Sequence, residues 1–352
     1  MKERELNEVW YGDRTGSWIL QPLARIYGAV IRLRWLAYLH GWLRVRSVNK
    51  PVIIVGNLTV GGAGKTPLVA WLATELTARG LTVGIASRGY GRSERTPRFV
   101  NTDSSWRDVG DEPVLLQART GCLTVVGADR VAAAKALIAK GVDVILSDDG
   151  LQHVRLGRDC ELVVMDGQRG FGNGHLLPAG PLREPVARLQ SVDALVINGA
   201  LPSVDAKNAV VIARALRDAA AISIVQMTLE SIDARHVADR EPPRPLESFV
   251  GKRVHAVAGI GNPARFFQGL VSRGIQVVEH PFPDHHPFTA ADLDFGDALP
   301  VLMTEKDAVK CRAFDDSRLW YVPVTARFSE SHARELLEHV VRKIAGHSGA
   351  QG

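Results

Sequence analysis

Short apolar runs rich in Val and Ile alternate with stretches of helical periodicity over residues 51–197. Runs of this kind predict buried strands, and apolar positions that recur every three or four residues predict amphipathic helices. The predicted strands are 51–55, 82–86, 123–126, 142–146, 161–165 and 194–197, and the predicted helices include 67–79, 113–119 and 130–140. Strands and helices that alternate in this way form a mostly parallel sheet with helices on both faces, so the expected fold class is α/β.

A proline-rich segment at residues 239–245 interrupts the alternation. Proline fixes its own φ and lacks a backbone N–H, so regular structure is not expected here. Further strands are predicted at 254–258, 275–278 and 301–304 and helices at 263–273 and 329–344, which indicates a smaller α/β domain. The expected organisation is an N-terminal amphipathic helix region (1–47), a core domain (48–222), a linker region (223–246), the smaller C-terminal domain (247–346) and a tail (347–352).

Residues 18–43 are rich in apolar and aromatic side chains but are divided by Arg25, Arg32 and Arg34. No uninterrupted apolar run approaches the roughly 20 residues that a membrane-spanning helix needs. An amphipathic helix here would lie in a membrane interface, with its arginines next to anionic lipid. Its apolar side would carry Leu23, Ile26, Tyr27, Val30, Leu33 and Tyr38. The alternative is a helix packed on the protein's own core, and Gly28 and Gly41 weaken the case for a single long helix.

Composition limits the choice of partner and compartment. With 352 residues of which 46% are hydrophobic, the chain can bury a large core. A net charge of +5 and a pI near 9.2 suit a partner that carries phosphates, whereas the scattered basic residues disfavour nucleic acid. The three cysteines are far apart and no secretory signal is visible, so a reducing cytosolic location is expected. No obligatory protein partner is predicted.

A glycine-rich segment joins a predicted strand to a predicted helix and ends in Gly64-Lys65-Thr66. This is the context of a P-loop, in which backbone N–H groups bind phosphate, the lysine reaches the β- and γ-phosphates, and the hydroxyl binds Mg²⁺. Thr59 stands where the general pattern has a glycine, and the alternative is a glycine-rich turn with a chance Gly-Lys-Thr. The predicted phosphate-binding residues are Thr59, Val60, Gly61, Gly62, Ala63, Gly64, Lys65 and Thr66.

Two carboxylates, Asp148 and Asp149, follow the apolar strand predicted at 142–146. The carboxyl end of a strand in an open α/β sheet faces the ligand crevice, where an aspartate can bind Mg²⁺ directly or through water. A strand that ends in Asp-Asp is by itself more often a solvated turn. Combined with the P-loop, the pair predicts a site for ATP and Mg²⁺ without indicating which aspartate is the inner ligand.

Several blocks of the sequence resemble one family, the tetraacyldisaccharide 4′-kinases, which are the lipid A 4′-kinases of Gram-negative bacteria. In order, the blocks are GNLTVGGAGKTP (56–67), SRGYGR (87–92), VGDEP (109–113), DDGLQH (148–153), LPAGPLRE (177–184), FPDHH (282–286) and TEKD (304–307). The resemblance extends from the N-terminal helix to about residue 326. Within this family the threonine at position 59 is ordinary.

The resemblance implies that the γ-phosphoryl group of ATP is placed on the 4′-hydroxyl of a tetraacylated glucosamine disaccharide 1-phosphate, a step of lipid A biosynthesis. It also implies a P-loop kinase core and a second α/β domain joined by a short β-linker, with the nucleotide between them. The expected location is the cytoplasmic face of the bacterial inner membrane, where the protein is peripheral and contacts an anionic surface.

Asp111 is the candidate general base, because a carboxylate that accepts the hydroxyl proton assists phosphoryl transfer. The resemblance assigns it to a catalytic dyad with His285, and Lys65 is the third predicted catalytic residue. Judged without the resemblance, Asp111 before Glu-Pro is more often a helix N-cap. A zinc site built from His280, His285, His286 and Asp284 is a further alternative, disfavoured because adjacent histidines rarely converge on one metal.

The remaining candidates surround the same motifs. Glu112 is expected to add to the Mg²⁺ shell, and His153 either orders nearby carboxylates or is a structural histidine. Arg88, Arg92 and Arg183 are expected to contact substrate or γ-phosphate oxygens, with solvated arginines as the alternative.

A membrane-associated lipid kinase is the leading hypothesis. The competing hypotheses are a nucleotide-dependent switch ATPase that docks on membranes and a kinase for a small water-soluble acceptor.

Overall fold

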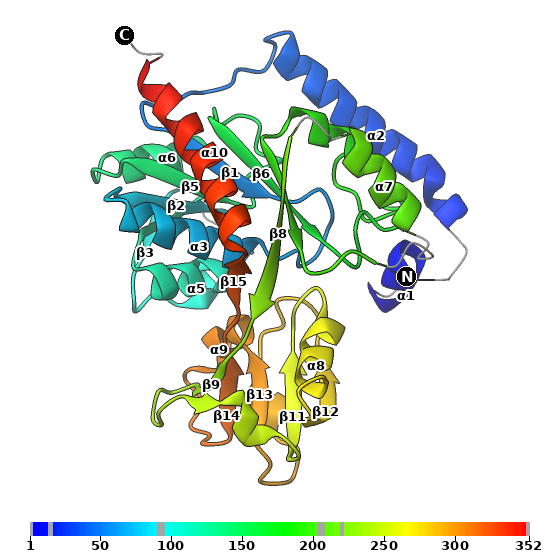
Figure 1. The fold of residues 1–352 in the computed structure, drawn as a ribbon, viewed down its shortest axis with the longest axis vertical. Coiled ribbons are helices and arrows are strands. Elements are labelled where there is room, and N and C mark those ends of the chain that lie inside the picture. Colours follow the sequence, from blue (N-terminus) through cyan, green and yellow to red (C-terminus); the bar gives the residue numbers. More distant parts are fainter. Residues whose placement is uncertain (1–2, 13–16, 90–95, 203–207, 219–221, 350–352) are drawn as a thin grey trace.

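The computed structural model describes residues 3–12, 17–89, 96–202, 208–218 and 222–349, which form two lobes along the longest axis of the molecule (Figure 1). A nine-stranded sheet organises the large lobe and a six-stranded sheet organises the small lobe. The expected α/β class, with a second and smaller sheet, is confirmed.

The large sheet has the strand order β15-β8-β7-β6-β1-β5-β2-β4-β3, and all neighbours are parallel except β3 with β4 and β15 with β8. Its central strands are buried along their whole length, because helices exclude water from both faces. The strands are β1 (Val52–Gly56), β2 (Val83–Ser87), β3 (Arg98–Val100), β4 (Leu123–Val126), β5 (Val144–Asp148), β6 (Cys160–Asp166), β7 (Ala194–Asn198), β8 (Ser223–Glu230) and β15 (Thr325–Phe328).

Two helical layers cover this sheet. The helices are α3 (Lys65–Ala78), α4 (Trp106–Val109), α5 (Asp111–Thr120), α6 (Arg130–Ile138), α7 (Ala209–Asp218) and α10 (Glu330–Gly349), with a 3-10 turn at Val186–Ser191. The apolar sides of α3 and α10 pack on one face, and those of α6 and α7 pack on the other. The predicted helices therefore form, with boundaries within two residues of expectation at most ends.

The small sheet has the order β10-β9-β14-β13-β11-β12, with four parallel strands from β14 to β12 and antiparallel β9 and β10 at the other edge. Its strands are β9 (Asp233–His236), β10 (Arg244–Pro245), β11 (Arg253–Ala258), β12 (Gln276–Pro281), β13 (Val301–Thr304) and β14 (Leu319–Val322). Its helices are α8 (Pro263–Val271) and α9 (Glu305–Cys311), with 3-10 turns at Leu246–Phe249 and Ala290–Leu293. Because β11 and β13 end at the waist between the lobes, the loops that follow them face the large lobe (Figure 1).

Two predicted domain boundaries differ from the structure. Residues 325–346 were expected in the smaller domain, but β15 pairs with β8 and α10 packs on the large sheet through Leu336, Leu337 and Val340. Residues 223–246 were expected to be a linker, but β8 is a full strand of the large sheet. The chain therefore enters the small lobe after β8 and returns to the large lobe at β15.

The N-terminal segment forms α1 (Glu3–Tyr11) and α2 (Ser17–Leu39). Gly28 was expected to weaken a single long helix, but α2 continues through it and ends two residues before Gly41. A Cβ at Gly28 would lie 2.9 Å from Leu176 Cδ1, so the glycine permits close packing on the large lobe. Figure 1 shows α2 along the outer side of that lobe.

One side of α2 rests on the protein and the other is exposed. Ala24 is buried, and the Arg188 guanidinium lies over the ring of Trp35 at 4.8 Å. The exposed apolar residues Ile19, Leu23, Ile26, Val30 and Leu33 are 55–64% accessible and are spaced four and three residues apart, so they share one side of the helix. In the described part of the chain, no helix is both long and apolar enough to cross a membrane.

The packing of α10 can be tested with two adjacent valines. Val340 is fully buried against the large sheet, whereas Val341 is 37% accessible. We expect Val340→Ala to lower the free energy of unfolding by about 2 kcal/mol, because it removes two buried methyl groups and leaves a cavity. The control Val341→Ala is expected to cost less than about 1 kcal/mol. Equal effects in urea denaturation would contradict this packing.

Candidate active site

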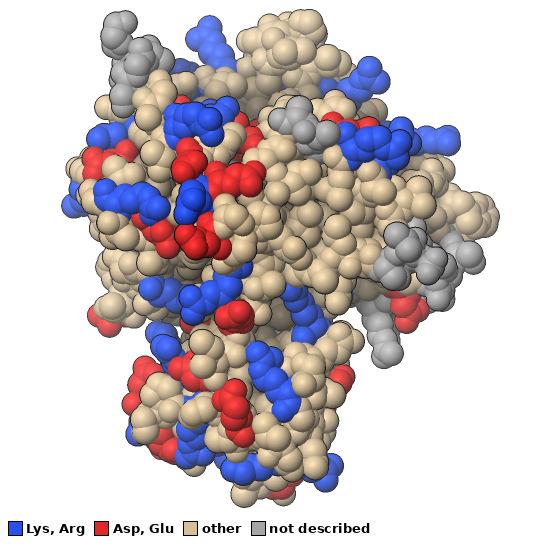
Figure 2. Space-filling model, viewed as in Figure 1, with Lys and Arg blue, Asp and Glu red and all other residues tan. Residues whose placement is uncertain are grey.

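A cavity of about 1130 Å³ lies between the lobes. Its walls come from the glycine-rich loop, the start of α5, the segment after β12, and α8 and α9, and α1 and α2 contribute to its rim. Figure 2 shows the surface hollowed at this waist, with charged side chains of both signs around it. Segments that are far apart in the sequence therefore meet in one cleft.

The glycine-rich loop joins β1 to α3, as the sequence predicts. Residues 60–66 line the cavity, whereas Thr59 is buried and pairs with Leu182. Gly64 has φ 98°, and a Cβ there would lie 2.4 Å from Asn198 Nδ2, so only glycine fits. Lys65 Nζ donates to Asn57 Oδ1 at 3.0 Å and lies 3.3 Å from Asp149. Asn57 and Asp149 thus fix the position of this amine.

The two aspartates at the end of β5 have different surroundings. Asp149, at φ 49°, pairs with Lys65 and with Arg183 at 3.0 Å. Burial raises its pKa, but these cations outweigh burial and hold the pKa well below its usual range. Asp148 is 1% accessible, and neither carboxylate oxygen has a hydrogen-bond partner in the described chain. Burial raises the pKa of Asp148 to about 7.

The unpartnered oxygens of Asp148 fit a cation, since a buried carboxylate normally has a partner. Thr66, at the start of α3, supplies a hydroxyl on the cavity wall. Among the described residues, no three His, Cys, Asp or Glu side chains are close enough to hold a metal ion by themselves. A divalent cation here would therefore complete its shell with phosphate and water oxygens.

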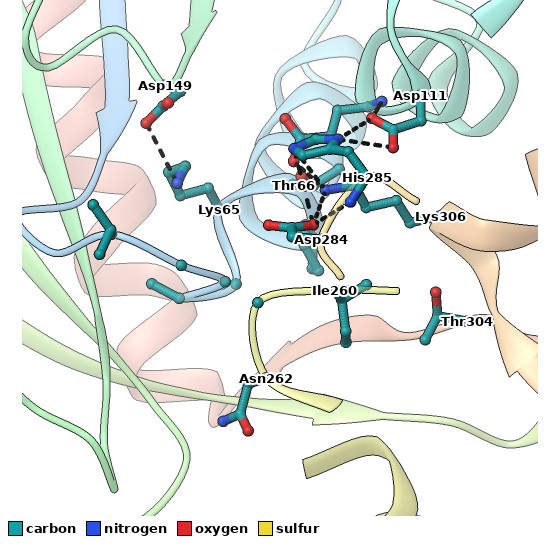
Figure 3. Close-up of a pocket in the computed structure, with 18 of the residues that line it drawn as sticks. Lys65, Thr66, Asp111, Asp149, Ile260, Asn262, Asp284, His285, Thr304 and Lys306 are labelled. Atoms are coloured by element: carbon teal, nitrogen blue, oxygen red, sulfur yellow. Dashed lines mark hydrogen bonds and ion pairs between the residues drawn. The ribbon is translucent and has the colours of Figure 1, made fainter. Parts of the chain in front are cut away.

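Asp111 and His285 meet across the two lobes, as shown in Figure 3. His285 Nδ1 lies 3.0 Å from Asp111 Oδ2 and 3.2 Å from Oδ1. Asp111 is 4% accessible but borders the cavity, and its pKa is lowered to about 2 because His285 and two lysines outweigh burial. The N-cap alternative is wrong, since Gly110 occupies the N-cap of α5 and Asp111 is the first helical residue.

Two lysines of α9 flank this pair. Lys306 Nζ lies 3.1 Å from Glu112 and Asp284 and 3.3 Å from His285 Nε2, and its pKa is raised by the carboxylates despite burial. Lys310 Nζ lies 3.7 Å from Asp111 Oδ2. Burial works to lower the pKa of His285, but its bond to Asp111 raises it above the usual value. Glu112, expected near Mg²⁺, is thus paired with Lys306.

The histidines considered for a zinc site point to different partners. His280 lies 2.9 Å from His255 Nδ1, His286 lies 3.3 Å from Asp292, and His285 faces Asp111. These side chains share no common centre, so the geometry gives the zinc alternative no support.

Three of the four predicted substrate-binding residues line the cavity. Arg183 lines the cavity and is paired with Asp149, and Arg88 lines it as an exposed residue. His153 also lines the cavity, and its Nε2 is buried without a hydrogen-bond partner in the described chain. Burial and Arg130 lower the pKa of His153 to about 4, which favours its neutral form. Arg92 lies outside the described residues.

Sequence reasoning missed several residues that form the site. Asn57 orients Lys65, and buried Arg130 donates to the carbonyl of Asp148 at 3.1 Å. Lys306 supplies the cation beside His285. Asn57 and Lys306 each follow the carboxyl end of a strand, which is the signal that would have identified them. Nothing local marks Arg130, since it is the first residue of an ordinary helix.

The small lobe also reaches the glycine-rich loop directly. Arg265 of α8 donates to Asn198 Oδ1 at 2.9 Å and to Asp166 at 3.1 Å. Asn198 in turn donates to the carbonyl of Ala63 at 2.9 Å. A Cβ on Gly261 would lie 2.7 Å from the backbone nitrogen of Gly62, so the two loops are in close contact.

The N-terminal helices contact the same region. Tyr27 of α2 donates to the carbonyl of Arg183 at 3.0 Å, and Arg34 donates to that of Gln152 at 2.8 Å. Trp10 of α1 donates to the carbonyl of Pro178 at 3.0 Å. The helix with the exposed apolar side therefore rests on loops that carry site residues.

Comparisons with known proteins agree over nearly the whole chain. A family model described as tetraacyldisaccharide-1-P 4′-kinase matches residues 16–342. The tetraacyldisaccharide 4′-kinase of Alkalilimnicola ehrlichii is 52% identical over 344 residues, which are 97% of this chain and 98% of that protein. That of Xanthomonas euvesicatoria pv. vesicatoria is 49% identical over 341 residues, covering 97% of this chain and 96% of the relative.

A solved structure has the same architecture. The crystal structure of LpxK from Aquifex aeolicus in complex with ATP superposes with a TM-score of 0.74 at 28% sequence identity. The match covers 93% of this chain and 99% of that chain, so both lobes are included.

Proposed function

The chain belongs to the tetraacyldisaccharide 4′-kinase family and has that activity in lipid A biosynthesis, and we propose that the cavity between its lobes is where the phosphoryl group is transferred. The observation that carries this assignment is that Asp111 and His285 border the same cavity as the Lys65 loop. A candidate base and a phosphate-binding loop thus open onto one space. Transfer from ATP to a hydroxyl requires this combination.

ATP would bind with its phosphates on the loop of residues 60–66. Backbone N–H groups and the N-terminus of α3 favour the negative charge, and Lys65 reaches the β- and γ-phosphates. Asp149, held by Arg183, keeps Lys65 in place. Thr66 and Asp148 are the residues that would hold Mg²⁺, consistent with the unpartnered oxygens of Asp148. When bound, the ion supplies charge neutralisation on the phosphate oxygens.

The apolar part of the cavity suits the nucleobase. Ile260, Phe266, Leu270 and Val322 line it on the small-lobe side, beyond Gly261, which touches the glycine-rich loop. A flat heteroaromatic base would bury apolar surface there while its phosphates lie on the loop. The nucleotide would then contact both lobes.

Asp111 would accept the proton of the 4′-hydroxyl. As the hydroxyl oxygen forms a bond to the γ-phosphorus, the bond from that phosphorus to the β,γ-bridging oxygen breaks and ADP leaves. The proton passes to the Asp111 carboxylate late in the transfer, and His285 orients that carboxylate. The low pKa of Asp111 keeps its carboxylate ionised, so no proton occupies it before the transfer.

The acyl chains of the acceptor place the reaction at a lipid surface. The exposed apolar side of α2 would insert into the interface of an anionic membrane, while Arg25 and Arg32, both exposed, meet the head groups. Because α2 contacts the loops of Arg183 and Gln152, insertion would bring the cavity close to the bilayer. The expected site is the cytoplasmic face of the inner membrane.

ATP turnover with and without the acylated disaccharide 1-phosphate separates kinase action from a switch ATPase. We expect turnover to depend on the lipid, and we expect each ADP released to be matched by one phosphorylated lipid. Hydrolysis at the same rate without the lipid, and no lipid product, would favour the switch ATPase.

Replacement of Asp111, the proposed general base, gives a second test. Asp111→Ala should lower kcat by ~10²-fold or more with little change in ATP affinity, as expected when proton acceptance is lost. Turnover and equilibrium nucleotide binding are the two measurements. A near-normal kcat would remove Asp111 from this role.

The membrane contact can be tested on the exposed side of α2. The double substitution Ile26→Glu and Val30→Glu should weaken cosedimentation with anionic vesicles by ~10-fold or more, because it removes apolar insertion and adds repulsive charge. Val250→Glu, on a comparably exposed valine of the small lobe, is the control. Similar vesicle binding by both proteins would argue against the α2 interface.

A further inference from the structure

We propose that Lys306 is a positioning residue that fixes the tautomer of His285, so that the imidazole donates to Asp111 and leaves that carboxylate as the proton acceptor. The inference rests on the proposed roles of Asp111 and His285 and adds a third member to them. Nothing in the comparisons assigns a role to this lysine.

Lys306 lies on the side of the imidazole opposite Asp111. The ring presents Nδ1 to Asp111 at 3.0 Å and Nε2 to the Lys306 amine at 3.3 Å (Figure 3). The two ring nitrogens of His285 are therefore both engaged, one by an anion and one by a cation. His285 itself has φ 60°, a left-handed backbone conformation that is uncommon for residues other than glycine.

The chemistry of the partners decides where the ring proton is. An ammonium group has three donors and no acceptor, so its hydrogen bond to Nε2 requires an unprotonated nitrogen. The single proton of the neutral ring is then on Nδ1, from which it can only be donated to Asp111. The other tautomer would set an N–H against the ammonium group and would leave Nδ1 and the carboxylate as two facing acceptors. That tautomer would therefore lose a hydrogen bond at each ring nitrogen, and Lys306 disfavours it.

Burial and charge keep the ammonium group in place. The Lys306 side chain is 15% accessible and lies 3.1 Å from both Glu112 and Asp284. These carboxylates compensate for its poor hydration and keep it protonated. They also come from different lobes, since Glu112 is in α5 and Asp284 follows β12. The amine is consequently correctly placed only when the lobes are in contact.

The position of Lys306 in its own helix is unfavourable. It is the second residue of α9, where the helix dipole disfavours a positive charge. Glu305 and Asp307 on either side are the residue types preferred in a first turn. A cation here has no local stabilising role in the helix, so its placement is explained by the groups that it contacts across the cavity.

A double-mutant cycle tests whether Lys306 acts through His285. Lys306→Met should lower kcat by ~10-fold or more, with a smaller change in KM for ATP. In the His285→Ala background the same substitution should have little further effect, because the ring that it orients is absent. Lys252→Met, which removes an exposed lysine of the small lobe, is the control and should leave kcat unchanged.

The outcomes separate this inference from the proposed dyad. If His285→Ala leaves kcat unchanged, the dyad is wrong and the inference falls with it. If His285→Ala lowers kcat but Lys306→Met does not, or if the two losses multiply in the double variant, the dyad stands and the inference is overturned.

A spectroscopic measurement does not depend on a folded variant of Lys306. The imidazole ¹⁵N shifts of the full-length protein, recorded where His285 is neutral, should show a protonated Nδ1 and an unprotonated Nε2. The His285 signals are identified by their absence in His285→Ala. A ring protonated on Nε2 would overturn the proposal.

Discussion

His285 from the small lobe and Asp111 from the large lobe are 3.0 Å apart, and the rest of the site is arranged around this contact. It forms because α9 lies against α5, where the ion pair of Lys306 with Glu112 joins the same two helices. Poorly hydrated charges are costly to separate from their partners, so the ion pair of Lys306 with Glu112 favours contact between the lobes. The cavity and its candidate base therefore depend on one cross-lobe arrangement.

Much of the fold could be predicted because the central strands are short, apolar and buried on both faces, and strands of that kind are visible in the sequence. β8 was missed because its burial alternates irregularly, and β15 because only one of its four residues is buried, so it has no apolar run. No local pattern tells which of two sheets α10 covers. Gly28 was misjudged because packing against Leu176 outweighs its low helix propensity.

The candidate site was predictable where its residues directly follow the carboxyl ends of strands. Lys65 and Asp149 were found from motifs at the carboxyl ends of β1 and β5, and they lie together in the structure. Side-chain contacts between the two lobes could not be predicted from the sequence in this way. Glu112 was expected near Mg²⁺ because it is a carboxylate beside Asp111, whereas its contact with Lys306 depends on how two separate sheets pack.

The return of the chain through β15 has a topological consequence. Thr325, the first residue of β15, is in register with Glu230, the last residue of β8, so the small lobe leaves and rejoins the large sheet at the same end of one antiparallel pair. It is an insertion in the chain, and a tight hairpin between these two residues would close the sheet without it. The two large hydrophobic clusters on the faces of the sheet contain no residue of the small lobe and would remain, whereas Asp111 would lose His285. The large lobe, which is built from two segments of the chain, thus contributes the glycine-rich loop and Asp111, and the inserted small lobe contributes His285.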